Sequence, residues 1–196
     1  QKSLFPIPGI DRSDDFRMRG ANPIASNGSI WTVPDVRKRI RSLTDRGGKL
    51  LVVDPRRTET AEMASEHLPI VPGTDALFLA AIAHTLFEEK LANPRDLAPF
   101  VDGLEDVAAA LAGFTPERAE AHTGIAAADM RRIAREFAAA DAAICYGRMG
   151  VSTQRFGALC QWLIQIINIA TGNLDREGGS MFTLPAVDQV PRTGAG

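Results

Sequence analysis

Short apolar runs give way to polar turns at four points of this 196-residue chain, and this pattern limits its fold more than any other feature. The turns lie at residues 20–23, 54–57, 72–75 and 147–150. Between the first two turns, Val36, Ile40 and Leu43 are spaced along one face of an expected helix, residues 35–46. A strand, a helix and a second strand of this kind form a βαβ unit with parallel strands. The pattern therefore predicts an open α/β sheet with the turns at its ligand-facing edge.

Basic residues alternate with apolar ones in the first expected strand of this sheet. The strands are expected at residues 16–19, 49–53, 68–71 and 142–146. Pro69 lacks a backbone N–H, so the third of them should be short or lie at an edge. Arg17 and Arg19 interrupt the first, although a central parallel strand is usually apolar on both faces. We therefore expect that strand either to lie at the edge of the sheet or to have its basic face covered by protein outside this chain.

Helical spacing of apolar residues recurs in the second half of the chain. Further helices are expected at residues 59–65, 76–83, 130–137 and 159–170, with Thr74 as an N-cap and Thr115 at another helix start. The expected organisation is an extended lead-in at 1–15, an α/β domain at 16–183 with a helical insertion at 91–140, and a tail at 184–196. The predicted fold class is a Rossmann-like open parallel sheet in a three-layer α/β/α arrangement. Because the chain begins with Gln1 and not Met, we expect it to be a piece of a longer protein.

Composition excludes several classes of function. The chain is 45% hydrophobic and 23% charged with a net charge of −2, so no bulk positive charge favours nucleic acid. The basic run at 37–41 is either a solvated helix face or a contact for phosphate or an acidic partner. No run reaches the roughly 18 apolar residues of a membrane span, so direct membrane insertion is not expected. The compartment stays unknown, with the cytoplasm slightly favoured over the periplasm.

The few cysteine and histidine residues predict no metal site in this chain. Cys145 and Cys160 form no CxxC motif and are expected to be buried thiols, and the three histidines belong to no ligand motif. The hydrolase and phosphate-loop motifs GxSxG, HExxH, Walker A and GxGxxG are absent from the sequence. Asn168 interrupts an apolar helix face, where it either forms a hydrogen bond between helices or contacts a ligand.

The residue types in the turns suit a nucleotide. Glycine at a strand end lets the backbone approach phosphate closely, and the candidates are Gly20, Gly73, Gly147 and Gly150. Asp54 and Asp75 can each accept two hydrogen bonds, from ribose hydroxyls or from the N–H groups of guanine. Arg56 can bind phosphate or stack on a base. Together the turns favour a nucleotide-like ligand over tight turns that serve structure alone.

Five segments occur in the order seen in the molybdopterin oxidoreductases, the family of formate dehydrogenases, nitrate reductases and dimethyl sulfoxide reductase. They are residues 20–27, 53–61, 72–75, 146–150 and 171–175. The chain resembles an internal piece of the large subunit, and the match covers about residues 16–183. The resemblance implies a bis(molybdopterin guanine dinucleotide) cofactor with Mo or W, of which this domain holds one dinucleotide. An iron–sulfur cluster can belong to the missing N-terminal region.

Carried over position by position, the resemblance implies a set of cofactor-binding residues. Those at the pyrophosphate or pterin side are Gly20, Ala21, Asn22 and Pro23; those at the guanosine end are Asp54, Arg56, Arg57, Gly73, Thr74 and Asp75; those against the pterin are Gly147, Met149 and Thr153. No catalytic residue and no metal ligand is identified in the segment. Arg17 and Arg19 depart from the apolar strand that is usual in the family.

The resemblance also implies an activity, which belongs to the longer protein. That activity is a two-electron oxidation or reduction at molybdenum, as in formate dehydrogenase or a related reductase, and the chain alone is expected to be inactive. The expected partners are the other domains of the parent chain and an electron-transfer subunit. One alternative is a structural subunit without molybdenum, such as the large iron–sulfur subunit of respiratory complex I. Another is an unrelated α/β nucleotide-binding module, such as the central domain of thiamine-diphosphate enzymes.

Overall fold

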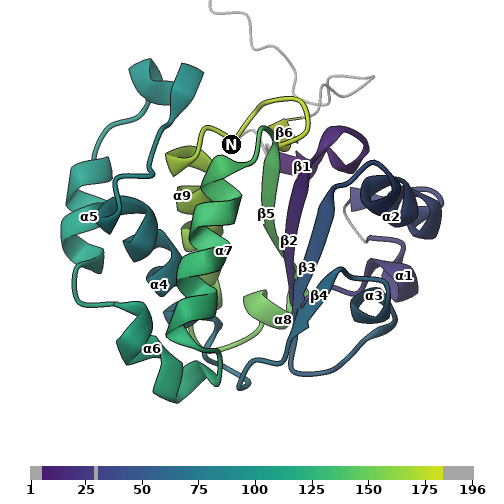
Figure 1. Ribbon diagram of the computed structural model, residues 1–196, viewed down its shortest axis with the longest axis horizontal. Coiled ribbons are helices and arrows are strands. Elements are labelled where there is room, and N and C mark those ends of the chain that lie inside the picture. The colour runs from purple at the N-terminus through teal and green to yellow at the C-terminus, as the bar shows by residue number, and fades with distance from the viewer. Residues whose placement is uncertain (1–5, 29–30, 183–196) are drawn as a thin grey trace, which may run out of the picture.

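Four parallel strands form the centre of the computed structural model, which describes residues 6–28 and 31–182 (Figure 1). They are β2 (Asp15–Arg19), β3 (Lys49–Val53), β4 (Glu66–Leu68) and β5 (Ala143–Gly147). Their order across the sheet is β4-β3-β2-β5, and Phe16 of β2 pairs with Leu50 on one side and Ile144 on the other. The open parallel sheet predicted from the sequence is confirmed.

Helices cover both faces of this sheet (Figure 1). On one side lie α1 (Pro23–Ser26), α2 (Val36–Asp45) and α3 (Glu59–Glu62). On the other lie α4 (Asp75–Glu88), α5 (Leu104–Leu111), α6 (Pro116–Thr123), α7 (Ala127–Ala139) and α9 (Gly157–Ala170). Two further short helices are α8 (Met149–Ser152), which follows β5, and η3 (Arg95–Phe100). The arrangement is the predicted three-layer α/β/α fold.

Two apolar cores hold the layers together, one on each face of the sheet. Strand β3 contributes to both because its side chains alternate: Leu51 and Val53 join α4, α7 and α9, while Leu50 and Val52 join α2. Helix α4 is apolar almost all round, and it packs against α5, α6, α7 and α9. Helix α2 begins where the Asp35 carboxylate accepts a 3.4 Å hydrogen bond from the N–H of Lys38, as an N-cap does.

The region before β2 contains elements that the sequence pattern did not predict. Strand β1 (Pro6–Pro8) pairs antiparallel with β6 (Ser180–Phe182), and η1 (Ile10–Arg12) follows it. The expected extended lead-in therefore holds a short strand, whose partner lies at the far end of the chain. The expected tail, 184–196, lies outside the described residues. The division of the chain into a domain with a helical insertion stays a prediction.

Strand β4 is shifted from its expected place. It covers Glu66–Leu68, whereas the sequence pattern suggested 68–71. The strand ends before Pro69, which has no N–H to donate to the ladder. Its place at one edge of the sheet is as predicted.

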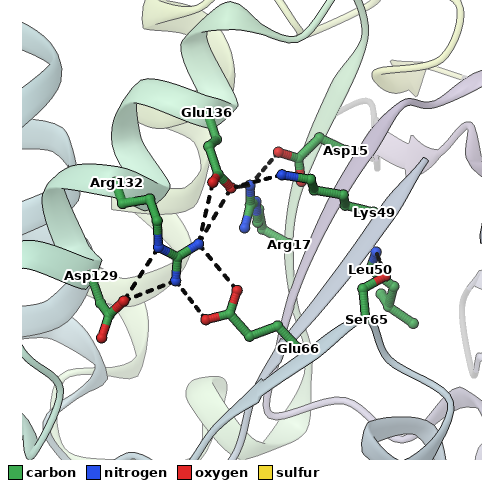
Figure 2. A network of polar contacts seen from close by, with 9 residues as sticks. All are labelled: Asp15, Arg17, Lys49, Leu50, Ser65, Glu66, Asp129, Arg132 and Glu136. Atoms are coloured by element: carbon green, nitrogen blue, oxygen red, sulfur yellow. Dashed lines mark hydrogen bonds and ion pairs between the residues drawn. The ribbon is translucent and has the colours of Figure 1, made fainter. Parts of the chain in front are cut away.

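Arg17 and Arg19 lie in a central strand and are covered by this chain's own helices, so both expectations for β2 were wrong. Arg17 is 2% exposed and contacts Asp15 and the Glu136 carboxylate of α7, the latter at 3.1 Å (Figure 2). Arg19 donates to the Cys145 sulfur at 3.2 Å, and its guanidinium lies 4.8 Å from the ring centre of Phe78. A cationic strand face is tolerated here because acidic, sulfur and aromatic partners replace water.

Asn168 bonds to a strand, which differs from both interpretations of its sequence position. Its side-chain amide forms two 2.9 Å hydrogen bonds with the backbone N–H and C=O of Cys145 in β5. Asn173 accepts from the N–H of Ala143 at 3.1 Å, and Gln161 donates to the C=O of Gly147 at 3.3 Å. Strand β5 lies at the end of the sheet, so these amides satisfy polar groups that a further strand would otherwise pair with.

Candidate functional site

The carboxyl ends of the strands bring three of the predicted turns to one edge of the sheet. Gly20 follows β2, Asp54 follows β3 and Arg148 follows β5. The chain moves outward from β2 to β3 and β4, and then returns to place β5 on the other side of β2. The strand order thus reverses between β2 and β5. Open α/β sheets bind ligands at such a switch point, outside the carboxyl ends of the strands.

Two glycines make close contact at the switch point. The N–H of Gly150 donates a 3.0 Å hydrogen bond to the C=O of Gly20, which has a φ of +50°. A Cβ on Gly20 would lie 2.8 Å from the Cα of Gly150, and a Cβ on Gly150 would lie 2.7 Å from the Cα of Gly20. Glycine is therefore required at both positions, because neither leaves room for a Cβ. At Gly20 the positive φ is a second reason.

A cavity of about 230 Å³ opens beside this contact. It is lined by five predicted residues, Gly20, Ala21, Asn22, Pro23 and Met149, together with Ala25, Ser26, Gly28, Tyr146 and Arg148. Gly147 lines a neighbouring cavity of about 130 Å³, which shares Tyr146 and Arg148 with the first. Thr153 lines neither cavity; its hydroxyl donates to the C=O of Met149 at 2.8 Å and closes the end of α8.

Side chains tie the turn after β2 to α3, the helix that follows β3. Asn22 donates to the Glu59 carboxylate at 2.7 Å and accepts from the Thr60 hydroxyl at 2.7 Å. Hydrogen bonds from its own backbone N–H and from Asn22 lower the pKa of Glu59. Asn22 therefore positions the turn. The Asp54 carboxylate accepts from the N–H of Arg56 at 2.9 Å, which fixes its own turn.

The predicted residues at the start of α4 form a separate group. Gly73 has a φ of +83° and open space where a Cβ would stand. Thr74 precedes α4 as predicted, but its hydroxyl donates to the C=O of Val71 at 2.7 Å and does not cap the helix. Asp75 is 6% exposed and accepts from the Gln154 amide at 2.9 Å. Because Gln154 follows α8, this bond connects the start of α4 to the turn after β5.

Gly73 and Thr74 face a different hollow from Gly20. They lie at an apolar groove of about 670 Å³ between α4, α5 and α9, where Phe114 and Trp162 are 44% and 46% exposed. The structure thus does not place the predicted residues in one cavity.

Two residues that line the switch-point cavity, Tyr146 and Arg148, carry buried polar atoms with no partner among the described residues. The Tyr146 hydroxyl and the Nε of Arg148 are buried without a hydrogen bond among the described residues. Burial raises the pKa of Tyr146 to about 12, although the nearby positive charge of Arg148 acts to lower it. The hydroxyl therefore stays protonated at neutral pH and can donate. Buried polar groups are normally hydrogen-bonded, and these two belong to residues that line the cavity, so Tyr146 and Arg148 are candidate ligand contacts.

Comparison with known proteins identifies the family. The family described as Molybdopterin oxidoreductase matches residues 4–192, nearly the whole chain. The chain belongs to the molybdopterin oxidoreductase family. It is 31% identical over 170 residues to formate dehydrogenase H of Escherichia coli K12. The aligned region covers 87% of this chain and 23% of that protein.

Other relatives agree with this assignment. A nitrate reductase of Symbiobacterium thermophilum is 30% identical over 91% of this chain, and the alpha subunit of F420-dependent formate dehydrogenase 1 of Methanococcus maripaludis is 30% identical over 94%. The chain spans 24% and 26% of these two relatives. The solved structure of acetylene hydratase from Pelobacter acetylenicus shares the fold, with a TM-score of 0.73 at 22% identity over 86% of this chain and 23% of that one.

The chemistry at the switch point fits the phosphate-bearing part of a molybdopterin oxidoreductase cofactor. The contact of Gly20 with Gly150 brings bare backbone to the cavity, and Arg148 adds a cation with an unpaired Nε. Within residues 6–28 and 31–182, no group of three or more His, Cys, Asp or Glu side chains is placed to hold a metal ion. Cys145 and Cys160 are both free and buried, as predicted. No described helix is long and apolar enough to cross a membrane.

Sequence reasoning did not identify four polar residues of this region. They are Glu59, Thr60, Arg148 and Gln154. Each lies inside or beside a predicted motif, so position in the sequence was a usable signal for all of them. Their side-chain partners come from other segments, which a motif does not specify.

Proposed function

We propose that this domain holds one dinucleotide of a bis(molybdopterin guanine dinucleotide) cofactor in a molybdenum- or tungsten-dependent oxidoreductase. The observation that carries the proposal is the cavity at the switch point. Five predicted residues line it together with Tyr146 and Arg148, each of which has a buried polar atom without a partner in the described part of the chain. The family and the order of the motifs along the edge of the sheet support the same proposal.

The proposed binding mode runs along the carboxyl edge of the sheet. Gly20, Ala21 and Pro23 offer backbone to the pyrophosphate or pterin side, while Asn22 holds their turn in place through Glu59 and Thr60. Met149, half-exposed at the cavity, packs against the pterin, with Gly147 and Thr153 shaping that turn.

The guanosine end lies farther along the edge in this proposal. Arg56 and Arg57 are exposed and can meet phosphate or base, beside the Asp54 carboxylate. Gln154 contacts one oxygen of Asp75, and the carboxylate has a second oxygen that can accept from a guanine N–H. Gly73 and Thr74, which precede Asp75 at the start of α4, would approach the same end of the dinucleotide.

The activity proposed for the whole protein is a two-electron oxidation or reduction, as in a formate dehydrogenase or related reductase. The metal of the bound cofactor supplies that redox chemistry, and this domain supplies binding, orientation and insulation. The chain spans about a quarter of its relatives' length. We therefore expect the chain alone to be inactive and the other domains and an electron-transfer subunit to be needed.

The first test is metal and pterin analysis of the full-length protein, purified without oxygen from a host that makes the cofactor. Near-stoichiometric Mo or W with about two pterins per polypeptide is expected. A protein with neither would contradict the proposal and support the structural, molybdenum-free alternative.

The second test concerns the guanine pocket. Asp75→Asn keeps an oxygen that can accept from Gln154 but removes the charge. It should lower the affinity for guanine nucleotides about tenfold or more, because hydrogen bonds to a charged group are the stronger kind. Asp102→Ala, an exposed loop substitution, is the control. Equal affinity in the two variants would show that the guanine pocket lies elsewhere.

A further inference from the structure

Arg148 is held at the switch point by its backbone. Its N–H donates to the C=O of Arg19 at 3.2 Å, which extends the pairing of β5 with β2 past the end of the strand. Its C=O accepts from the N–H groups of Val151 and Ser152 at 3.0 and 3.1 Å. The residue is therefore fixed on both sides, between the two turns that contact each other through glycine.

The cation of Arg148 has no counter-charge in the described part of the chain. None of the ion pairs found there includes it, and its Nε is buried without a hydrogen bond. The Nε of the buried Arg17 also has no hydrogen bond among the described residues, but the charge of Arg17 is balanced by two carboxylates. A guanidinium is always charged, and its forked donors match carboxylate and phosphate oxygens. Arg148 is partly exposed, so a ligand that enters the cavity can reach it.

Tyr146 provides a second donor in the same place. Its ring lies against Phe16 and Trp31, with ring centres 6.0 and 5.9 Å apart, and its buried hydroxyl has no partner among the described residues. Tyr146 and Arg148 line both the 230 Å³ cavity and its 130 Å³ neighbour. Two lining residues that carry a protonated hydroxyl and a guanidinium favour an acceptor-rich anion.

We propose that Arg148, with the Tyr146 hydroxyl as a second donor, binds the oxygens of a phosphate or diphosphate group in the switch-point cavity. The inference rests on the proposed function, in which that group is the pyrophosphate of the bound dinucleotide. Arg148 is then the residue that neutralises the pyrophosphate charge, while the glycine turns supply close backbone contact.

One experiment measures cofactor content in the full-length protein purified from a cofactor-producing host. The variants are Arg148→Gln, Arg148→Lys and Tyr146→Phe, with Arg118→Gln as a control. Arg118 lies on α6, and its guanidinium donates a hydrogen bond to the C=O of Gly113, away from the switch-point cavity. Less GMP and pterin per polypeptide is expected for Arg148→Gln, with the control unchanged.

A second experiment separates the phosphate contact from the rest of the ligand. Cofactor-free full-length protein is titrated by calorimetry with GDP, guanosine and inorganic phosphate. Arg148→Gln should bind GDP about tenfold more weakly, because it loses a charge-assisted contact, and should bind guanosine as the wild type does. The loss should shrink at high salt. Tyr146→Phe should show a smaller loss for GDP.

Each contrary outcome has a distinct meaning. If the wild type binds GDP and Arg148→Gln binds it equally well, the inference is wrong and the proposed function stands. If the wild type binds neither GDP nor guanosine and holds no pterin, the proposed function fails and the inference fails with it. Phosphate bound as tightly as GDP, without guanosine binding, would assign the site to free phosphate and overturn the dinucleotide assignment. If Arg148→Gln does not fold, unchanged GDP affinity in both Arg148→Lys and Tyr146→Phe overturns the inference.

Discussion

Gly150 donates its backbone N–H to the C=O of Gly20 at 3.0 Å, and each glycine occupies space that a Cβ on the other would need. This contact joins the turn after β5 to the turn after β2. Because the two turns carry the residues that line the switch-point cavity, the contact fixes the shape of that cavity. The candidate site is therefore built on backbone geometry first and on side chains second.

Replacement of one of these glycines should destabilise the domain. In Gly150→Ala the new Cβ would lie 2.7 Å from the Cα of Gly20, so backbone must move. We expect a loss of about 1–3 kcal/mol in the free energy of unfolding, measured in urea. Gly113→Ala is the control, because its Cβ would meet only the flexible end of Arg118 at 3.2 Å. An equal loss of unfolding free energy in the two variants would contradict the claim that the contact with Gly20 requires glycine at position 150.

The amide of Asn168 should matter more than its size. Asn168→Leu would leave the N–H and C=O of Cys145 buried without their side-chain partner. We expect a loss of about 2–4 kcal/mol in unfolding free energy, since two polar groups become unsatisfied. Gln165→Leu on the same helix is the matched control, because the Oε1 of Gln165 is buried and accepts no hydrogen bond from the described residues. If Gln165→Leu lost as much unfolding free energy as Asn168→Leu, the loss would come from placing leucine in this helix. It would then not come from the hydrogen bonds of Asn168.

The Glu136 carboxylate should stabilise the charged face of β2. It contacts Arg17 at 3.1 Å, Lys49 at 3.5 Å and Arg132 at 3.4 Å (Figure 2). Burial acts to raise the pKa of Glu136, but Arg17, Lys49 and Arg132 outweigh it and the pKa is lowered. Glu136→Gln should therefore cost about 1.5–3 kcal/mol at neutral pH, in line with hydrogen bonds to charged groups. The exposed Glu62→Gln should change the unfolding free energy little in the same urea assay.

Local patterns predicted the parts of the fold that depend on local chemistry. Strand β3 and helix α2 were predicted within a residue or two, because an apolar run and an amphipathic face are visible in a short window. The partners of Arg17 could not be predicted in this way, because Glu136 is supplied by a helix far along the chain. Strand β1 was missed for the same reason, since its partner β6 comes from the other end.

The sequence also predicted only part of the candidate site: the shared edge of the turns, but not the partners of their side chains. Turns at the ends of parallel strands must share an edge, so the meeting of residues 20–23 with Met149 follows from topology. The bonds of Asn22 to Glu59 and of Asp75 to Gln154 could not be read from the motifs, because a motif gives residue types and not side-chain directions. The structure thus adds a support role for Asn22 in its turn, and its contact with a ligand stays a prediction.

Acid should remove the stabilisation that Glu117 gives to the outer helices. Hydrogen bonds from Arg131, followed by one from its own backbone N–H, lower the pKa of Glu117 from 4.5 to about 2. A folded-state pKa below the unfolded one means that the stabilisation is present above about pH 4.5 and is lost as the pH falls toward 2. The Glu117 side chain is 57% exposed, so solvent screening limits the effect to under about 1 kcal/mol.

The measurement compares the wild type with Glu117→Gln by urea unfolding at a series of pH values. The wild type should be the more stable at neutral pH, and the difference in unfolding free energy should shrink below about pH 4.5 and diminish with added salt. Glu105→Gln, a change at an exposed residue of α5, should give no such trend. A difference that stays constant down to low pH would show that Glu117 acts through packing and not through its charge, because only the charge is lost on protonation.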